Sequence, residues 1–378
     1  MPIERPFKFG ADFDHLRRVI MRETVDGPVP IIEMMADGSI MGEVTGMEHP
    51  IDAMTELGEL ADRGEGGQQE AIEKGLRFLE LNVAFSKAVG YDSAWTIPIV
   101  PIPRTRAQYS VSEEITKARP WQNEHKGIIP DRETFESFKW ATVDQIDLAT
   151  LYYTSELLPP GMKMHVFYMG IFEDLRMIMG FEQMAIKSVD EPKLLGDILE
   201  QLTIFAERAI DQSAAHPAAG AIFYADDMGF NTSTMLSPAF YRTWLFPRLK
   251  RLADACHKHN KPFLFHSCGF VDTLMEDLIE FVGIDGFHSF QDSIMPIEEV
   301  YEKYGDRISI LGGVDVGLLA RGTPDEVRAR CRQILDTCGP NGGFAIGSGN
   351  SVTNYCKIEN YYAMIDEARK WNEEKGYL

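Results

Sequence analysis

The chain has 378 residues, 44% of them hydrophobic, and its 58 acidic residues outnumber its 37 basic residues to give a net charge of −21. That charge disfavours binding to nucleic acid or to anionic membranes, and no apolar run approaches the roughly 18 residues that a membrane span needs. The N-terminal stretch MPIERPFKFGADFDHLRRV lacks the apolar core of a secretory signal, and the five cysteines are scattered and odd in number. We therefore expect a cytoplasmic protein.

Short apolar runs alternate with longer segments of helical periodicity. The apolar character of the runs is nearly continuous, which is typical of parallel strands that helices cover on both faces. The runs span residues 29–35, 93–100, 162–170, 220–227, 261–268, 283–290, 307–315 and 342–349. Eight strands with intervening helices predict an α/β fold, the (β/α)8 TIM barrel. An open doubly wound sheet is the alternative, but no GxGxxG motif follows the first run, which disfavours it.

Helix-starting residues follow several of these runs. Ser237 stands before Pro238 as an N-cap residue before a proline at the first helical position. Thr323 and Glu326, with a proline between them, have the spacing of a capping box. Such residues satisfy the free N–H groups of a first helical turn, so they support helices after the strands.

The whole chain, residues 1–378, is expected to form one barrel domain. The first 70 residues are predicted to supply N-terminal helices that close one end of the barrel. Residues 101–160, between the second and third predicted strands, are less regular. We interpret them as an insertion that lies over the barrel mouth.

Polar residues that follow the predicted strands are the strongest candidates for functional residues, because the carboxyl ends of barrel strands form the active-site rim. This predicted rim comprises Glu33, Asp37, Asp226, Asp227, His266, Cys268, His288, Asp315, Ser348 and Asn350. A single aspartate at a strand end usually caps the next helix, so the convergence of several such residues is the signal. We assign acid/base roles to Asp226, Asp227 and His288, and substrate contacts to Tyr168, Tyr224, Asp315 and Asn350.

A histidine and a cysteine stand two positions apart at the end of the fifth run, in the sequence KPFLFHSCGF. Side chains at i and i+2 of a strand point to the same side, so His266 and Cys268 should both face the barrel axis. An imidazole and a thiolate together suit a borderline-soft divalent metal, of which zinc is the usual choice. Cys356 and Glu33 are weaker candidates for further metal ligands.

Three longer stretches resemble one known superfamily. They are YADDMGFNTSTMLSPAFYRTWLFPRLKRL with FLFHSCG, YGDRISILGGVDVGLLARGTPDEV, and GSGNSVTNYCKIENYYAMIDEARK. These stretches are similar to the uroporphyrinogen decarboxylase-like superfamily, whose members are (β/α)8 barrels. Its members include uroporphyrinogen decarboxylases and cobalamin-dependent methyltransferases.

The resemblance favours the methyltransferase branch. The decarboxylases carry an arginine-bearing motif in the first strand that grips the carboxylates of the tetrapyrrole, whereas EMMADGS, residues 33–39, contains no arginine. A carboxylate at Glu33 or Asp37 would repel a polycarboxylate substrate. The methyltransferase branch carries the H-x-C pair matched by His266 and Cys268, where it binds zinc.

The same branch usually supplies a third metal ligand, a cysteine, after the last strand. In this chain the matching position holds Asn350. The further ligands could be Glu33, Asp227, His288, Cys356, a water or the substrate. The resemblance implies that zinc keeps an acceptor thiol deprotonated, since a free thiol is mostly protonated at neutral pH. It also implies a corrinoid carried by a partner protein, because the chain has no DxHxxG-type cobalamin-binding module of its own.

Three functional hypotheses remain at this point. The first is a zinc-dependent methyltransferase that moves a methyl group between a corrinoid protein and a small substrate, a thiol or a tetrahydrofolate-type acceptor. The second is a metal-independent decarboxylase or lyase that acts on a smaller substrate, with Asp226 or Asp227 as acid/base and two tyrosines, Tyr168 and Tyr224, orienting the substrate. The third is a non-catalytic protein that binds a corrinoid or tetrapyrrole. Assembly as a homodimer is left open.

Overall fold

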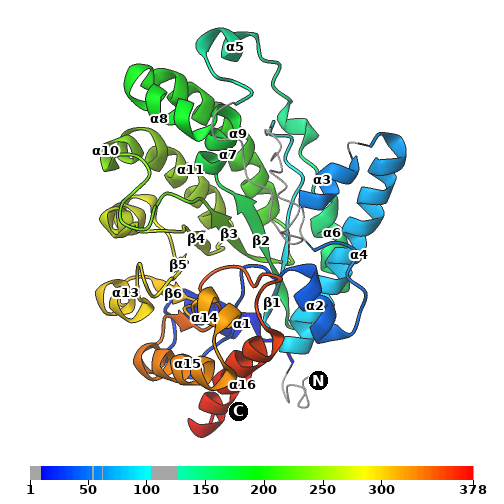
Figure 1. Cartoon of the computed structure of the whole chain (residues 1–378), viewed down its shortest axis with the longest axis vertical. Coiled ribbons are helices and arrows are strands. Elements are labelled where there is room, and N and C mark those ends of the chain that lie inside the picture. Colours follow the sequence, from blue (N-terminus) through cyan, green and yellow to red (C-terminus); the bar gives the residue numbers. More distant parts are fainter. Residues whose placement is uncertain (1–9, 53–54, 62, 104–126, 378) are drawn as a thin grey trace.

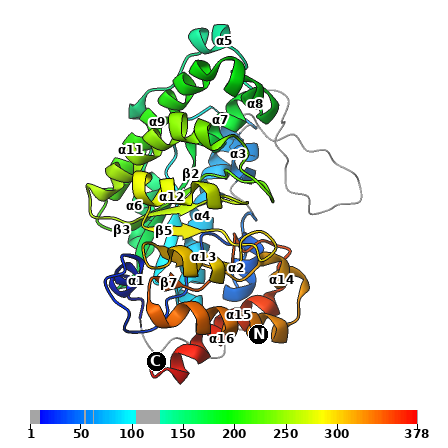
Figure 2. The same ribbon diagram turned by 90° about the vertical axis from the view of Figure 1, so that its left-hand side faces the viewer.

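A computed structural model of the chain describes residues 10–52, 55–61, 63–103 and 127–377. Residues 104–126, which belong to the predicted insertion, lie outside this part of the chain. Figures 1 and 2 show a curled parallel sheet at the centre, with helices around its outer side. The fold is therefore α/β and TIM-barrel-like, as the alternating apolar and helical segments predict.

The described part of the sheet has seven parallel strands in sequential order (Figure 1). The strands are β1 Ser93–Thr96, β2 Lys163–Met169, β3 Ala219–Ala225, β4 Phe263–His266, β5 Gly286–His288, β6 Ser309–Leu311 and β7 Phe344–Ala345. Each pairs with the next in parallel, so all of their carboxyl ends lie at one edge. That edge carries the predicted rim.

The first of the eight predicted strands, residues 29–35, forms only an isolated parallel bridge, between Ile31 and Ile346. Pro30 has no N–H group to donate to a neighbouring strand. Its carbonyl oxygen accepts a hydrogen bond from Ile346 N at 2.9 Å. One step further along, Ser348 N donates to a side-chain oxygen of Glu33 at 2.8 Å. A side chain thus replaces the main-chain acceptor, and the ladder stops after one bridge.

Helices connect the strands and cover their outer faces. The helices before β2 are α1 Phe13–Ile20, α2 Gly38–Thr45, α3 Thr55–Ala61, α4 Glu65–Val89, α5 Arg132–Ser137, η1 Val143–Gln145 and α6 Ala149–Leu157. Those up to β5 are α7 Ile171–Met179, α8 Phe181–Asp190, α9 Pro192–Ala214, α10 Pro238–Phe240, η2 Tyr241–Leu245, α11 Phe246–His257, η3 Asp272–Leu274, α12 Met275–Asp277 and η4 Leu278–Val282. The last are α13 Ile297–Tyr304, α14 Val316–Arg321, α15 Pro324–Cys338, η5 Gly339–Asn341 and α16 Ile358–Glu374.

The two helix starts predicted from sequence are confirmed. Ser237 accepts a hydrogen bond from Phe240 N at the start of α10, with proline in the first turn. At the start of α15, Thr323 and Glu326 form the reciprocal capping box. Both caps satisfy N–H groups that the helix itself cannot pair.

Helix α1 closes the amino end of the sheet. Its apolar side chains join the inward-facing residues of the strands in one buried cluster, which includes Phe167, Phe223 and Leu264. Phe13 packs so closely on Gly220 that a Cβ there would lie 2.2 Å from its ring, and Ser309 Oγ donates to a carbonyl of α1 at 2.5 Å. The predicted closure by N-terminal helices therefore holds for α1, whereas α2 and α4 pack together and α4 lies beside β1.

Part of the predicted insertion belongs to the ordinary helix layer. Helix α6 packs against α4, β1 and β2, which is where the helix between two neighbouring strands of a barrel belongs. Within the described residues, no helix combines the length and the apolar character needed to cross a lipid bilayer.

Candidate metal centre

The ends of two neighbouring strands bring the candidate ligands together. β3 and β4 pair in parallel so that Ala225 lies opposite His266, the last residue of β4. Asp227 and Cys268 each follow two positions later, on the same side as these two residues. The loops that carry them touch main chain to main chain, because a Cβ on Gly229 would lie 2.7 Å from the carbonyl carbon of Gly269.

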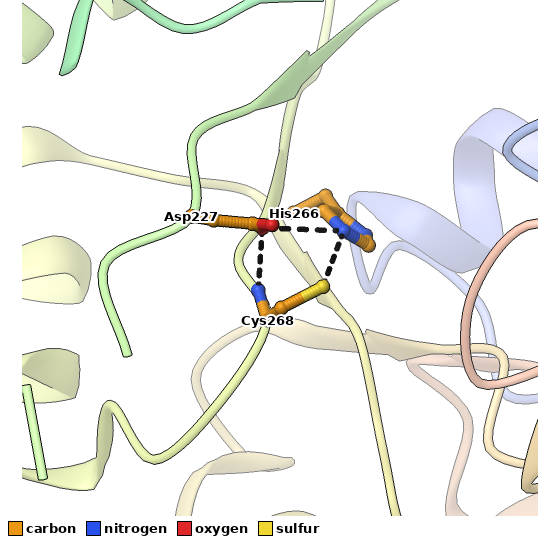
Figure 3. A group of neighbouring side chains, drawn as sticks. All are labelled: Asp227, His266 and Cys268. Carbon is orange, nitrogen blue, oxygen red and sulfur yellow. Dashed lines mark hydrogen bonds and ion pairs between the residues drawn. The ribbon is translucent and has the colours of Figure 1, made fainter. Parts of the chain in front are cut away.

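Three donor atoms converge at this point: a carboxylate oxygen, an imidazole nitrogen and a sulfur (Figure 3). His266 Nε2 lies 3.4 Å from Cys268 Sγ and 3.6 Å from Asp227 Oδ1. All three donor atoms lie within 4.8 Å of one another. Cys268 N also donates to Asp227 Oδ1 at 2.8 Å, which holds the carboxylate against the loop that carries the cysteine.

The spacing of these atoms fits a zinc ion. With bonds of about 2.0 to 2.3 Å, the ligands of a tetrahedral zinc ion lie about 3.3 to 3.8 Å apart. The two separations from His266 Nε2, 3.4 Å and 3.6 Å, fall in this range. Thiolate, imidazole and carboxylate are also the three ligand types that zinc takes in proteins.

His266 is held by a second histidine. Its Nδ1 lies 2.6 Å from Nδ1 of His288, and Nε2 of His288 lies 3.2 Å from the carbonyl oxygen of Ser348. Burial lowers the pKa of His266 to about 3, and burial together with the neighbouring His266 lowers the pKa of His288 well below its usual value. Both rings are therefore neutral at pH 7, and His266 can offer a lone pair on Nε2.

Cys268 needs a cation to become a thiolate. Burial and the Asp227 carboxylate raise the pKa of its thiol, while hydrogen bonds from Ser289 and Asn350 act in the opposite direction. Asn350 Nδ2 lies 3.1 Å from Sγ, and Ser289 Oγ lies 3.7 Å from it. A divalent metal beside the sulfur would supply the missing positive charge.

A cavity of about 1170 Å³ lies next to this group, with Cys268 in its wall. Two residues predicted to contact substrate, Asp315 and Asn350, also line it. The carboxylate of Asp315 accepts from Gly317 N at 2.6 Å and from Asp292 N at 3.0 Å, so it caps α14 as well. Asn350 lines the cavity beside Cys268, and its Nδ2 lies 3.1 Å from the sulfur.

Asp226 lies on the opposite face of the chain from Asp227. It is fully buried and accepts from Phe172 N at 3.2 Å and from Glu173 N at 2.8 Å, at the start of α7. Burial raises the pKa of Asp226 well above its usual value, although these two backbone hydrogen bonds act against the rise. Its position is that of a helix cap, outside the three-ligand group.

The two tyrosines predicted to orient a substrate also point into the helix layer. The hydroxyl of Tyr168 lies 2.6 Å from Ser213 Oγ of α9. Ile171 N, at the start of α7, donates to the hydroxyl of Tyr224 at 2.7 Å. Both side chains are buried there, which leaves neither in a position to contact a substrate in the cavity.

The two weaker ligand candidates lie outside the group. Glu33 is buried and contacts Ser348 through both carboxyl oxygens, and burial raises its pKa to about 8. The sulfur of Cys356 lies 3.7 Å from Thr353 Oγ1, and burial raises the pKa of this thiol. Neither residue belongs to the group formed by Asp227, His266 and Cys268.

Ser289 is the site residue that the sequence did not indicate. It follows β5 directly and has a backbone φ of 109°, a value that residues other than glycine seldom adopt. Nothing in the letters FHSF marks this conformation, so the sequence gives no sign that Ser289 contributes to the site.

Solved structures of two other proteins are similar to this chain. A methyltransferase from Methanosarcina mazei is similar at a TM-score of 0.71, with 15% sequence identity over 96% of this chain and 99% of that chain. A candidate vitamin-B12-independent methionine synthase from Listeria monocytogenes reaches a TM-score of 0.48, with 11% identity over 93% of this chain and 99% of that chain. A search of curated proteins finds no match.

The first likeness supports the fold alone, because so low an identity does not transfer an activity. The sequence itself matches the family described as uroporphyrinogen decarboxylase (URO-D) over residues 134–371. That range covers well over half of the chain and includes β2 to β7, with both strands that carry the three-ligand group. The chain therefore belongs to the uroporphyrinogen decarboxylase family.

Proposed function

We propose that this protein is a zinc-dependent methyltransferase that moves a methyl group between a corrinoid protein and a thiol or another small acceptor. The observation that carries the proposal is the group of Asp227, His266 and Cys268 in contact with a cavity of about 1170 Å³. Membership of a family of enzymes and the fold shared with a structure named as a methyltransferase support the same reaction class.

The charges of the group suit this chemistry. A thiolate and a carboxylate together balance the two positive charges of zinc, and His266 is neutral. Zinc bound here would keep an acceptor thiol deprotonated at neutral pH while leaving its sulfur nucleophilic. The chain itself positions the acceptor: Cys268 and Asn350 reach the cavity wall, and Asp227 is held against the loop after β4.

The charges around the cavity argue against a tetrapyrrole with many carboxylates. Its described lining contains two arginines, Arg321 and Arg330, and three carboxylates, Asp292, Asp315 and Glu326. Arg330 is already held by Asp292 at 2.7 Å and by a further contact to Glu298. A polycarboxylate would meet more like charge than opposite charge, so decarboxylation of such a substrate is the weaker alternative.

The corrinoid belongs on a partner protein in this proposal. The methyl donor would enter from the side of the cavity, where Cys268 and Ser289 line the wall. The net charge of −21 leaves nucleic acid an unsuitable partner and favours docking surfaces of neutral or basic character.

The direct test is methyl transfer from methylcobalamin to a small thiol, followed by the absorbance change that accompanies loss of the cobalt–carbon bond. We expect turnover by the zinc-loaded protein, loss of turnover after chelation, and recovery when zinc is added back. Cys268→Ser should abolish turnover, whereas Cys356→Ser, a change at a cysteine outside the group, should retain it. Equal turnover with and without chelation would refute a role for the metal, whereas no turnover by the zinc-loaded protein would favour the lyase alternative.

A further inference from the structure

We propose that Ser289 and Asn350 are positioning residues that hold the sulfur of Cys268 for the metal, and that the unusual backbone of Ser289 exists to bring its hydroxyl there. This inference rests on the proposed metal centre and concerns residues around it that donate to a ligand rather than bind the ion. Residues of this kind typically change metal affinity by one to two orders of magnitude when they are removed.

The argument begins with His288 and Ser289, which are neighbours in the chain. Neighbouring side chains of a regular strand point to opposite faces. Phe287, just before them, packs on Phe290, and both belong to a large buried cluster that includes residues of the surrounding helices. Yet His288 contacts His266 at 2.6 Å and Ser289 contacts Cys268 at 3.7 Å. One dipeptide therefore contacts two of the candidate ligands, which regular alternation would not allow.

The backbone of Ser289 explains how this happens. Its φ of 109° turns the chain directly after β5 and brings the hydroxyl to the same side as the His288 ring. Positive φ is sterically unfavourable for a residue with a Cβ and free of that cost for glycine. Such strain persists where the surrounding structure imposes it, and it concentrates at functional sites.

A second segment, residues 348–350, interlocks with the first. Phe290 N donates to Gly349 O at 2.9 Å, and a Cβ on Gly349 would lie 2.0 Å from Phe290 O, so the two chains touch. The side chain of Asn350 is fixed in orientation, because its Oδ1 accepts from Ser351 N at 2.8 Å. Its amide nitrogen must then face the sulfur of Cys268, which it approaches to 3.1 Å.

This arrangement accounts for the asparagine at the position where related methyltransferases are expected to carry a cysteine ligand. An amide N–H cannot bind a metal, but it can donate to a thiolate that does. The three-ligand group gains its oxygen from Asp227, so the third ligand comes from the loop after β3. Asn350 then stabilises the charge on the sulfur from the other side of the group.

Two substitutions of Ser289 distinguish the effect of its hydroxyl from the effect of its backbone strain. Ser289→Ala removes the hydroxyl and keeps a Cβ at positive φ, whereas Ser289→Gly removes the hydroxyl and the strain together. Cobalt(II) is the probe, because its sulfur-to-metal charge-transfer absorption reports on the bond to Cys268. Binding is measured by competition with a chromophoric chelator, and the Tm of the metal-free protein reports stability.

We expect both variants, and Asn350→Ala, to bind cobalt about tenfold more weakly than the unchanged protein. Their charge-transfer absorption should shift to longer wavelength, since a sulfur without these donors gives up electrons more easily. Only Ser289→Gly should raise the Tm of the metal-free protein. Ser351→Ala, which removes another hydroxyl from the cavity wall and keeps the main-chain N–H, should match the unchanged protein.

Three results would overturn the inference. Cobalt affinity and absorption unaltered in all three variants would show that neither side chain positions the sulfur. A Tm for Ser289→Gly that does not exceed the Tm of Ser289→Ala would show that the backbone is not strained. An unchanged protein that fails to bind cobalt would instead remove the metal centre itself, and this outcome is distinct from the other two.

Discussion

Nδ1 of His266 and Nδ1 of His288 lie 2.6 Å apart in the buried end of the sheet, so one nitrogen must carry a proton and the other must accept it. Nε2 of His288 faces the carbonyl of Ser348, which can only accept, and it must therefore be the protonated nitrogen of that ring. The remaining proton belongs to Nδ1 of His266. This assignment leaves Nε2 of His266 unprotonated beside Cys268 and Asp227, as a metal requires.

Replacement of His288 by phenylalanine should therefore weaken zinc binding although His288 is not itself a member of the group. We expect an affinity loss of about 10- to 100-fold, because the ring of His266 loses the partner that fixes its orientation and tautomer. The unpaired Nδ1–H should also reduce the free energy of unfolding by about 1 to 3 kcal/mol. Chelator competition and urea unfolding measure the two effects.

The matched control for this change is His257→Gln. His257 pairs with the carboxylate of Asp285 at 2.7 Å and lies at the end of α11, outside the three-ligand group. Zinc affinity should stay at the value of the unchanged protein. A His288→Phe protein that binds zinc with undiminished affinity would contradict the assigned tautomers.

Replacement of the adjacent residues Asp226 and Asp227 by alanine should have contrasting effects on stability and on zinc binding. Asp226→Ala leaves two buried N–H groups at the start of α7 without an acceptor, which should cost about 1 to 3 kcal/mol of unfolding free energy. Asp227 has a side chain that is 33% exposed, so its loss should cost less stability but should remove a ligand. Urea titrations with parallel zinc measurements would test this crossed pattern, and equal effects of the two changes would count against it.

The same pair shows why the sequence predicted only part of the site. Strands that are buried on both faces are apolar throughout, so no alternation of polar residues reveals which face each side chain takes. Asp226 and Tyr224 face the helices, whereas Ala225 and Asp227 face inward, and a register shift of one residue would exchange the two sets. This ambiguity does not affect His266 and Cys268. They stand two positions apart, so their side chains share a face whichever face the strand turns inward.

Two other differences have local causes that the amino-acid letters do not show. A run with strand composition, residues 29–35, makes only one bridge, because Glu33 offers its carboxyl group where a main-chain oxygen would continue the ladder. The hydroxyl of Ser289 reaches the site because of a backbone angle that the sequence does not reveal. The barrel-like fold itself was predictable, since it depends on the repeated apolar runs and not on any single residue.

Zinc should stabilise the folded protein, since an unfolded chain does not hold the three ligands together. At a free zinc concentration of about 100 times the dissociation constant, the expected gain is about 2.7 kcal/mol, visible as a higher Tm that chelation reverses. Cys268→Ser should lose this increase. Cys356→Ser should keep it, and an equal zinc response from both serine variants would exclude Cys268 as a ligand.

The buried carboxyl of Glu33 should make stability fall as the pH rises. Burial raises its pKa from the usual 4.5 to about 8, so between these pH values the folded protein keeps a proton that the unfolded chain has released. Its contribution is therefore fully present below pH 4.5 and is lost progressively up to about pH 8. The slope in this window is about 1.4 kcal/mol per pH unit.

The proton also fits the hydrogen bonds around Glu33. A protonated carboxyl can donate to the hydroxyl of Ser348, which in turn donates to the carbonyl of Asn350, while Ser348 N donates to the other carboxyl oxygen at 2.8 Å. Glu33→Gln can reproduce these contacts, because an amide both donates and accepts, but it does not titrate. Urea unfolding of both proteins from about pH 5 to pH 8 isolates the effect, since the other titrating groups cancel in the difference. The unfolding free energy of the unchanged protein should fall steadily relative to that of the glutamine variant, and a difference that stays constant with pH would mean that Glu33 is ionised throughout.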